Sequence, residues 1–312
     1  MSSDTSTRNA PATRIYGLIA RAARVGVLFR RGPSKQVLLV YWDMERDLFY
    51  PGQWLNGRIY ERRSDLSPSG KRLVYLAASH KPPYHTWTAV SRPPYLTAVV
   101  FWPNMGTWGG GGLFEKENRL SLNHNSSYLK PTKGARVPQE LSVAQVGDCP
   151  VGGEDARILD CRLRRDGWRL IQEGVVTRHD YGAFLWIEYD PPTVWAHPRP
   201  GGSGPWELRM IERGIKERNG TWNVVEYALR NGETEQEAPL GRLDWADWCH
   251  SGDLVFTRDG CVWRMAVDET DCFPPHERRL VDLRPLTFRE LAPPQPYDWA
   301  VDVPLPPPYR AD

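Results

Sequence analysis

The sequence predicts an all-β protein, and three observations support this prediction. The 28 prolines are scattered along the chain, and proline breaks helix interiors but is tolerated at strand edges and turns. Short runs such as residues 206–210 alternate apolar and polar residues with the period of a strand. Four Asx-Gly dipeptides, which supply the positive φ angles of two-residue hairpin turns, stand beside such runs. They are Asp166-Gly167, Asn219-Gly220, Asn231-Gly232 and Asp259-Gly260.

The chain reads as a succession of short strands. Residues 25–30 and 36–41 are expected to form a hairpin, whereas residues 15–23 fit either a short helix or a strand. The least β-like stretch is 130–160, which we expect to be an insertion with a short helix at 140–144.

We expect one domain over residues 14–300, preceded by a disordered tail at 1–13. A proline-rich C-terminal tail follows at 301–312. Within that tail, residues 306–309 read Pro-Pro-Pro-Tyr and formally fit a ligand of WW domains. Because such short motifs arise by chance, a simple extended tail is the preferred interpretation.

Charge and cysteine content favour a cytoplasmic protein that binds neither nucleic acid nor membranes. Lys and Arg number 40 against 38 Asp and Glu, so the basic excess typical of nucleic-acid binders is missing. An odd count of five cysteines without tight spacing suits a reducing compartment. The longest apolar stretch, 95–103, is far shorter than the ~20 residues of a membrane span, and no secretory signal opens the sequence.

Weak internal repeats predict a single irregular β-propeller. Residues 65–75 and 247–256 each open with Asp and reach Ser-Gly just before a Leu-Val-aromatic strand. A second pair, 161–170 and 255–264, shares Arg-Asp-Gly flanked by strand residues. With roughly 40–45 residues per blade, the chain length predicts four to six blades of antiparallel meander sheets.

Residues 65–75, which read Asp-Leu-Ser-Pro-Ser-Gly-Lys-Arg-Leu-Val-Tyr, resemble the blade motif of TolB-type and WD40-like propellers. Leu66 stands where that family usually has Trp, and Ser69 where it has Asp. The match covers about eleven residues well and about ten more, near Asp247, loosely. The chain is also similar to uncharacterised bacterial proteins of its length. The resemblance implies a fold and a binding platform, and a fold does not imply a function.

No residue set predicts a catalytic centre, a cofactor or a metal. Cys249-His250, Cys261 and Cys272 lack the paired, closely spaced ligands of zinc sites, so these cysteines are expected to be buried structural residues. No Gly-x-Ser-x-Gly nucleophile motif occurs, and the acids between Asp43 and Asp65 read as turn and cap residues.

The best candidates for a contact surface lie in two predicted loops. Four consecutive glycines between bulky apolar residues suit a loop that orders on a partner, although a packed turn between strands is the competing interpretation. No Gly-Lys-Ser/Thr follows, so the loop is not a nucleotide-binding P-loop. The candidate contact residues are Trp54, Trp108, Gly109, Gly110, Gly111, Gly112 and Phe114.

The sequence favours a non-catalytic scaffold that presents loops to a protein partner. The alternative is a carbohydrate-binding protein or hydrolytic enzyme acting at the central pocket of the propeller. A central pocket lined by aromatic and acidic residues would favour the alternative. A featureless centre with an exposed apolar rim would favour the scaffold.

Overall fold

A computed structural model shows a chain made almost entirely of β-strands. It describes residues 13–32, 35–104, 106–125, 129–132, 137–147, 155–180, 186–202, 204–215, 222–267 and 276–310. Of these described residues, 53% lie in strands and one segment is an α-helix, which confirms the all-β prediction.

The first half of the chain forms three of the five sheets. The first sheet contains β1 (Arg14–Ile19), β2 (Val25–Arg31), β3 (Gln36–Asp43) and β4 (Leu48–Asn56). The second sheet contains β5 (Arg58–Leu66), β6 (Leu73–Ala78), β7 (Thr86–Ser91) and β8 (Ala98–Asn104). The third sheet contains β9 (Gly112–Lys116), β10 (Arg119–Leu122) and β11 (Ser142–Gln145).

The second half of the chain forms the helix and the other two sheets. The fourth sheet follows α1 (Ala156–Arg165) and contains β12 (Arg169–Gln172), β13 (Val176–Asp180), β14 (Trp186–Pro198), β15 (Trp206–Ile215), β16 (Asn223–Asn231) and β17 (Glu237–Arg242). A short 3-10 helix, η2 (Pro200–Gly202), separates β14 from β15. The fifth sheet contains β18 (Trp245–Trp248), β19 (Leu254–Arg258), β20 (Cys261–Met265) and β21 (Glu277–Asp282).

Each sheet is built from strands that follow one another in the chain, and the pairing is antiparallel except between β10 and β11. The strand β11 occupies the place where the sequence predicts a short helix at 140–144, so that prediction is wrong. The segment 15–23, left open between helix and strand, contains β1.

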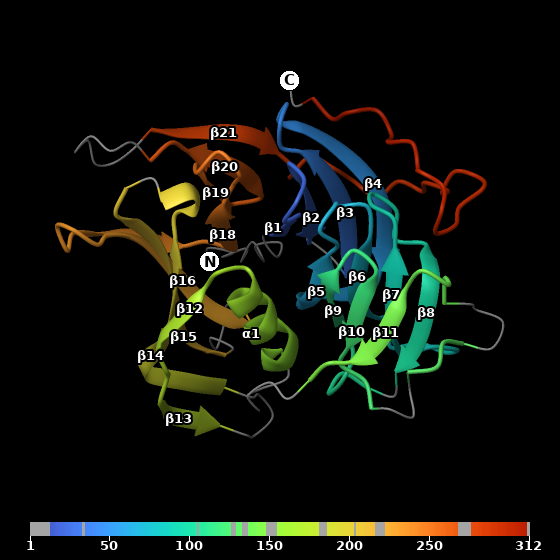
Figure 1. The fold of residues 1–312 in the computed structure, drawn as a ribbon, viewed down its shortest axis with the longest axis horizontal. Helices are drawn as coiled ribbons and strands as arrows, with labels where there is room; N and C mark the ends of the chain where they lie inside the picture. Colours follow the sequence, from blue (N-terminus) through green and yellow to red (C-terminus); the bar gives the residue numbers. More distant parts are fainter. Residues whose placement is uncertain are drawn as a thin grey trace, which may run out of the picture.

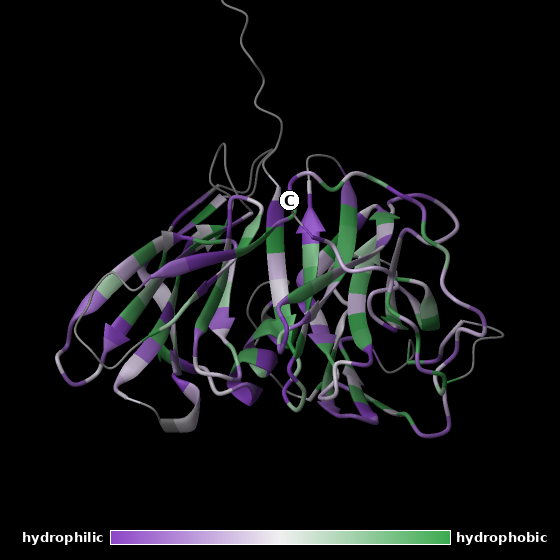
Figure 2. Cartoon of the chain, turned by 90° about the horizontal axis from the view of Figure 1, so that it is seen from above, coloured by the Kyte–Doolittle hydropathy of each residue, from purple (hydrophilic) through white to green (hydrophobic). Residues whose placement is uncertain are grey.

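The hydrophobic core is divided among the junctions between neighbouring sheets (Figure 1). Separate clusters of buried residues join the first sheet to the second, the second to the third, the fourth to the fifth, and the fifth back to the first. Figure 2 shows hydrophobic segments along the strands and many hydrophilic residues at strand ends and in connections. Neighbouring sheets therefore pack directly in chain order, except the third and fourth, and the fifth sheet packs against the first.

The helix α1 lies at the remaining junction, between the third and fourth sheets, where it contacts β5, β9 and β12. Its apolar residues Leu159 and Leu163 join the core of the fourth and fifth sheets. Of its arginines, Arg162 is buried and Arg165 is half-buried, whereas Arg157 and Arg164 are exposed. The junction that lacks direct sheet packing is thus closed by a helix.

The strand expected before Asp166-Gly167 and the hairpin at this dipeptide are wrong, because residues 161–167 form and end α1, whereas Arg169 and Leu170 do lie in a strand, β12. Gly167 has a φ of 95°, and its N–H donates to the carbonyl of Arg164. The N–H of Trp168 donates to the carbonyl of Leu163. This is a Schellman C-cap, which needs the same positive φ as a hairpin turn. The Asx-Gly signal therefore did not distinguish the two structures.

The repeat between residues 65–75 and 247–256 occupies equivalent positions in two sheets. Each segment joins the first strand of a sheet to the second, β5 to β6 and β18 to β19. In each turn a glycine with positive φ, Gly70 or Gly252, donates its N–H to the carbonyl three residues earlier, at Ser67 or Cys249. The sequence similarity therefore reflects one turn structure used twice.

The predicted hairpin at Asp259-Gly260 is confirmed. Arg258 pairs with Cys261, and the two turn residues have φ angles of 53° and 73°, as a type I′ turn requires. Asn231 ends β16, and its side chain caps the turn by accepting the N–H groups of Glu233 and Thr234. Asn219-Gly220 lies outside the described residues.

The C-terminal segment packs against the first two sheets. Trp299 is buried, and Arg92 donates to its carbonyl over 2.5 Å. The N–H of Tyr309 donates to the carbonyl of Phe49 on β4 over 2.6 Å. Tyr309, in the expected Pro-rich extended tail at 301–312, is therefore held against the first sheet through its backbone.

We expect Gly260→Val to lower the free energy of unfolding by about 1 kcal/mol or more, since a β-branched residue resists a φ of 73°. A Cβ atom at this position would also lie 2.5 Å from Cγ of Arg284. Urea unfolding measures the effect. Gly106→Val is the matched control, because no atom lies within 4 Å of a Cβ there. Equal stability of the two variants would refute the proposed turn.

Candidate functional site

Two cavities open on successive segments of β1, and Tyr16 lines both. One has a volume of about 490 Å³ and is lined by residues 16–21 together with parts of α1 and the fourth and fifth sheets. The other has a volume of about 140 Å³ and is lined by Arg14, Ile15 and Tyr16 with residues of β2, β5, β16 and β17. We call them the aromatic cavity and the arginine pocket.

Five aromatic side chains line the aromatic cavity. They are Tyr16, Trp168, Tyr227, Trp245 and Trp248. Its volume lies within the range of ordinary small-molecule sites, in which apolar walls carry a few polar groups. The turns after β1, β5 and β18 all contribute residues or flanking residues, so equivalent parts of three sheets meet here.

The carboxylates of the aromatic cavity are mostly held by one arginine. Arg165 donates to both oxygens of Asp65, over 2.6 and 2.9 Å, and to both oxygens of Asp166. Asp65 also accepts the N–H of Phe114 over 2.7 Å. Because Asp65 is almost fully buried, this bidentate pair stabilises a charge that would otherwise be costly.

A histidine–aspartate pair also lines this cavity. Nδ1 of His197 is 3.0 Å from Oδ1 of Asp247, and the His197 ring packs at 4.9 Å from the Trp168 ring. Asp247 belongs to the repeated turn and also accepts the N–H of Trp248. A Cβ on Gly167 would lie 3.3 Å from Nε2 of His197, so the glycine leaves room beside this nitrogen.

Three polar groups of the aromatic cavity have no hydrogen-bond partner among the residues that the structure describes. They are Nε2 of His197, Oδ2 of Asp247 and the hydroxyl of Tyr227. Burial raises the pKa of Tyr227, so this hydroxyl stays protonated and can donate. The charged lining residues balance, because Arg21, Arg162 and Arg165 stand against Asp65, Asp166 and Asp247. The cavity is thus suited to a neutral, polar ligand.

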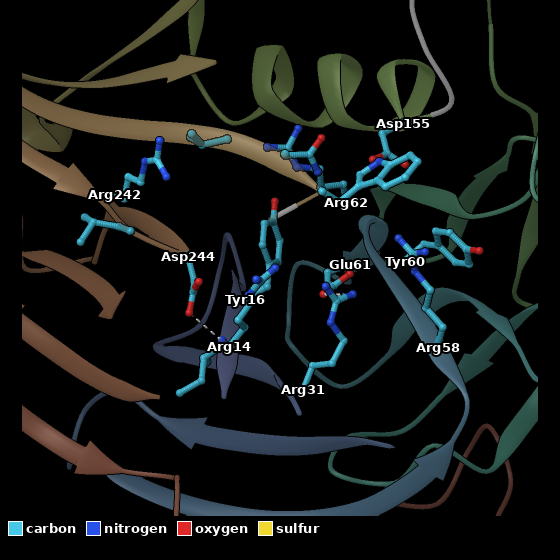
Figure 3. A pocket seen from close by; sticks show the side chains of 15 residues that line it. Arg14, Tyr16, Arg31, Arg58, Tyr60, Glu61, Arg62, Asp155, Arg242 and Asp244 are labelled. Atoms are coloured by element: carbon cyan, nitrogen blue, oxygen red, sulfur yellow. Dashed lines mark hydrogen bonds and ion pairs between the residues drawn. The ribbon is translucent and has the colours of Figure 1, made fainter. Parts of the chain in front are cut away.

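The arginine pocket has a different character (Figure 3). Its charged lining residues are Arg14, Arg31, Arg58, Arg62 and Arg242, with Glu61, Asp155 and Asp244. They come from β1, β2, β5, β17, the start of α1 and the segment before β18. Burial raises the pKa of Asp244 to about 6, although Arg14 and Arg31 oppose the shift.

The predicted contact residues line neither cavity. Trp108 is 83% exposed, in agreement with its expected position in an exposed loop. Trp54 is half-buried, with its ring 6.0 Å from that of Phe288 and the Arg30 guanidinium 5.3 Å above it. Phe114 is fully buried between the second and third sheets, so its prediction as an exposed contact residue is wrong.

The glycine loop is packed, which corrects the expectation of a mobile segment. Gly110, Gly111 and Gly112 are buried, and Gly109 is half-buried. The N–H of Gly110 donates to the carbonyl of Asn123, and that of Gly111 to the Thr88 hydroxyl. A Cβ on Gly111 would lie 2.3 Å from the carbonyl oxygen of Arg63, so close backbone approach explains the glycine. The competing interpretation, a packed turn, describes the loop correctly.

The cysteines agree only in part with the sequence analysis. Cys249 and Cys261 are free and buried, as expected, whereas Cys272 lies outside the described residues. Cys161 is disulfide-bonded, which the expectation of a reducing compartment did not include.

Within the described ranges, no group of three or more possible metal ligands occurs. There, α1 is the one α-helix, and no helix is long and apolar enough to cross a membrane.

Comparison with known proteins adds no family assignment. No protein-family model matches the chain, and no curated protein matches it. The site must therefore be interpreted from its own geometry.

Asp244 should make the protein less stable as the pH rises from about 4 to 6. Its pKa of about 6 in the folded state exceeds the ordinary value of 3.8, so the folded state holds the proton more tightly than the unfolded state over this range. The free energy of unfolding should therefore decrease between pH 4.5 and 7 because of Asp244. In Asp244→Asn we expect this decrease to be smaller by about 1 kcal/mol or more. Urea unfolding at both pH values measures it, and an unchanged decrease would contradict the assignment.

Proposed function

We propose that the five sheets are blades of an irregular β-propeller. Three findings support this: each sheet uses consecutive strands, four of the five junctions have a core of their own, and the fifth sheet packs against the first. The same turn after β5 and β18 supports a blade repeat. Five blades would fall within the range that the chain length predicts.

We further propose that this protein binds a neutral, polar small molecule of the carbohydrate type in the aromatic cavity. The observation that carries the proposal is a charge-balanced cavity of about 490 Å³ with indole walls and unpartnered hydrogen-bonding groups. Indole faces stack on the apolar faces of sugar rings, while hydroxyl groups need donors and acceptors placed around them. His197, Asp247 and Tyr227 supply such groups.

The geometry favours binding over hydrolysis. Glycoside hydrolysis needs two carboxyl groups free to act as acid and as base or nucleophile. Asp65 and Asp166 are instead both bonded to Arg165. Only Asp247, bonded through one oxygen, faces the cavity without an arginine partner among the described side chains. A single such carboxylate, paired with His197, positions a ligand.

The test is titration of neutral mono- and oligosaccharides, followed by intrinsic tryptophan fluorescence and calorimetry. We expect one sugar class to change the fluorescence, because three tryptophans line the cavity. His197→Gln should weaken binding at least tenfold, whereas His85→Gln, an exposed loop residue outside the cavity, should leave it unchanged. Failure of the whole panel to bind, or equal binding by both variants, would refute the proposal.

A second candidate function, a scaffold for a protein partner, is supported by Trp108. An indole that is 83% exposed above a packed loop is the kind of residue that anchors protein interfaces. This candidate is independent of the aromatic cavity.

We expect Trp108→Ala to leave the free energy of unfolding within about 0.5 kcal/mol of wild type, because the side chain makes few contacts. The same variant should lose a partner that wild type and the exposed control Arg178→Gln both retain in affinity capture. A loss of ~3 kcal/mol or more would show that Trp108 is a core residue. Retention of every captured protein would exclude the contact role.

A further inference from the structure

We propose that the arginine pocket is a binding site for a phosphate group, separate from the aromatic cavity. The ligand is inorganic phosphate or the phosphate end of a monoester, and both present the same dianionic group. The proposal rests on the charge of the pocket, the state of two arginines and the directions from which they come.

Five guanidinium groups and three carboxylates line the pocket (Figure 3). Some of them form ion pairs with each other or with residues outside the pocket. Glu61 pairs with Arg31 over 3.2 Å. Asp155 pairs with Arg63 outside the pocket over 2.7 Å, and Arg62 pairs with Glu212 outside it over 2.5 Å. Among the described residues, none of the three carboxylates forms an ion pair with Arg14 or Arg58.

Arg58 is held by aromatic rings and not by an acid. Its guanidinium lies 4.4 Å from the Tyr60 ring centroid and 5.8 Å from that of Trp222. Among the described residues it has no carboxylate partner, and its buried Nε has no hydrogen-bond partner. Stacking fixes the plane of a guanidinium while leaving its donor edge open, which is how arginine recognises oxyanions.

Arg14 is the second arginine without an ion pair among the described residues. The positive charge of Arg14 acts to lower the pKa of Asp244. The hydrogen bond of Asp244, however, is to the backbone, because its Oδ2 accepts the N–H of Ile15 over 3.2 Å. Asp244 therefore bonds to the backbone of β1. Within the described part of the chain, it forms no ion pair with an arginine. Arg14 remains available to a ligand.

The number and origin of the arginines favour phosphate over carboxylate. A carboxylate is satisfied by one bidentate guanidinium, whereas a phosphate group has three terminal oxygens and about −1.5 to −2 charges near pH 7. Here Arg14 and Arg58 line the space from strands of two different sheets, β1 and β5. The volume of about 140 Å³ fits one compact group and is small for a nucleotide.

Calorimetric titration of the full chain with inorganic phosphate and with glycerol 3-phosphate, at constant low ionic strength, tests the proposal. We expect saturable binding of at least one of them, weakened tenfold or more by Arg58→Gln and by Arg14→Gln. Arg119→Gln is the control, since it removes the same charge from an exposed position on β10. Glycerol and acetate, at the same concentrations, should not compete.

The two arms identify the source of the phosphate group. Tighter binding of glycerol 3-phosphate indicates a monoester ligand, and binding of inorganic phosphate alone indicates the free ion. Absence of binding in both arms, or an equal loss in the Arg119→Gln variant, would overturn the proposal.

A measurement on the wild-type protein covers the case in which a variant fails to fold. Phenylglyoxal modifies accessible guanidinium groups, and mass spectrometry locates the modified residues. We expect phosphate to slow modification of Arg14 and Arg58 at least threefold while leaving Arg119 unchanged. Uniform rates with and without phosphate would refute the site.

Discussion

The centre of the molecule depends on the guanidinium groups of α1. Arg162 donates to the carbonyls of Glu61 and Ser64 on β5 and, over 2.6 Å, to the hydroxyl of Tyr16 on β1. Arg165 holds Asp65 and, over 2.9 Å, the carbonyl of Phe114 on β9. One turn of helix thereby joins three sheets. Removing one partner of such a buried pair costs about 3–5 kcal/mol, because the other charge is left without compensation.

The pairing of arginines with acids gives the two cavities their different electrostatics. Arg165 holds Asp65 and Asp166 and so engages two of the three carboxylates of the aromatic cavity, and Arg21 and Arg162 bring its charged lining residues into balance. On the other side of Tyr16, Arg62 pairs with Glu212 outside the arginine pocket, and Arg63 pairs with Asp155, which lines it. The electrostatic character of each cavity therefore follows from how the acids are distributed among the arginines.

Local patterns predicted local structure well. The strand alternation, the Asp259-Gly260 turn and the repeated turns at residues 65–75 and 247–256 depend on neighbouring residues only, so the sequence displays them. The helix at Ala156–Arg165 was not predicted. Its several arginines leave only a narrow apolar stripe, and its C-cap contains the same Asx-Gly pattern as a hairpin turn.

The cavities could not be predicted in the same way. Arg14, Arg58 and Arg242 are far apart in the sequence, and only the arrangement of the sheets brings them together. The carboxylates Asp65 and Asp247 did carry a signal, since both open a repeated segment. Their position beside one cavity follows from the equivalent place of β5 and β18 in their sheets. Trp108, in contrast, was recognised by its glycine neighbours and is exposed.

The junction between the first and fifth sheets has a consequence for synthesis of the chain. The N–H of Ile15 bonds to Asp244, and its carbonyl accepts the Thr257 hydroxyl, across sequence separations of 229 and 242 residues. A ribosome adds about 5–20 residues each second, so β1 must wait on the order of ten seconds or more for these partners. During that interval one edge of the nascent first sheet is uncovered, and a chaperone or another nascent chain can reach it. The order in which the ribosome releases the sheets thus determines how long that edge is exposed to aggregation.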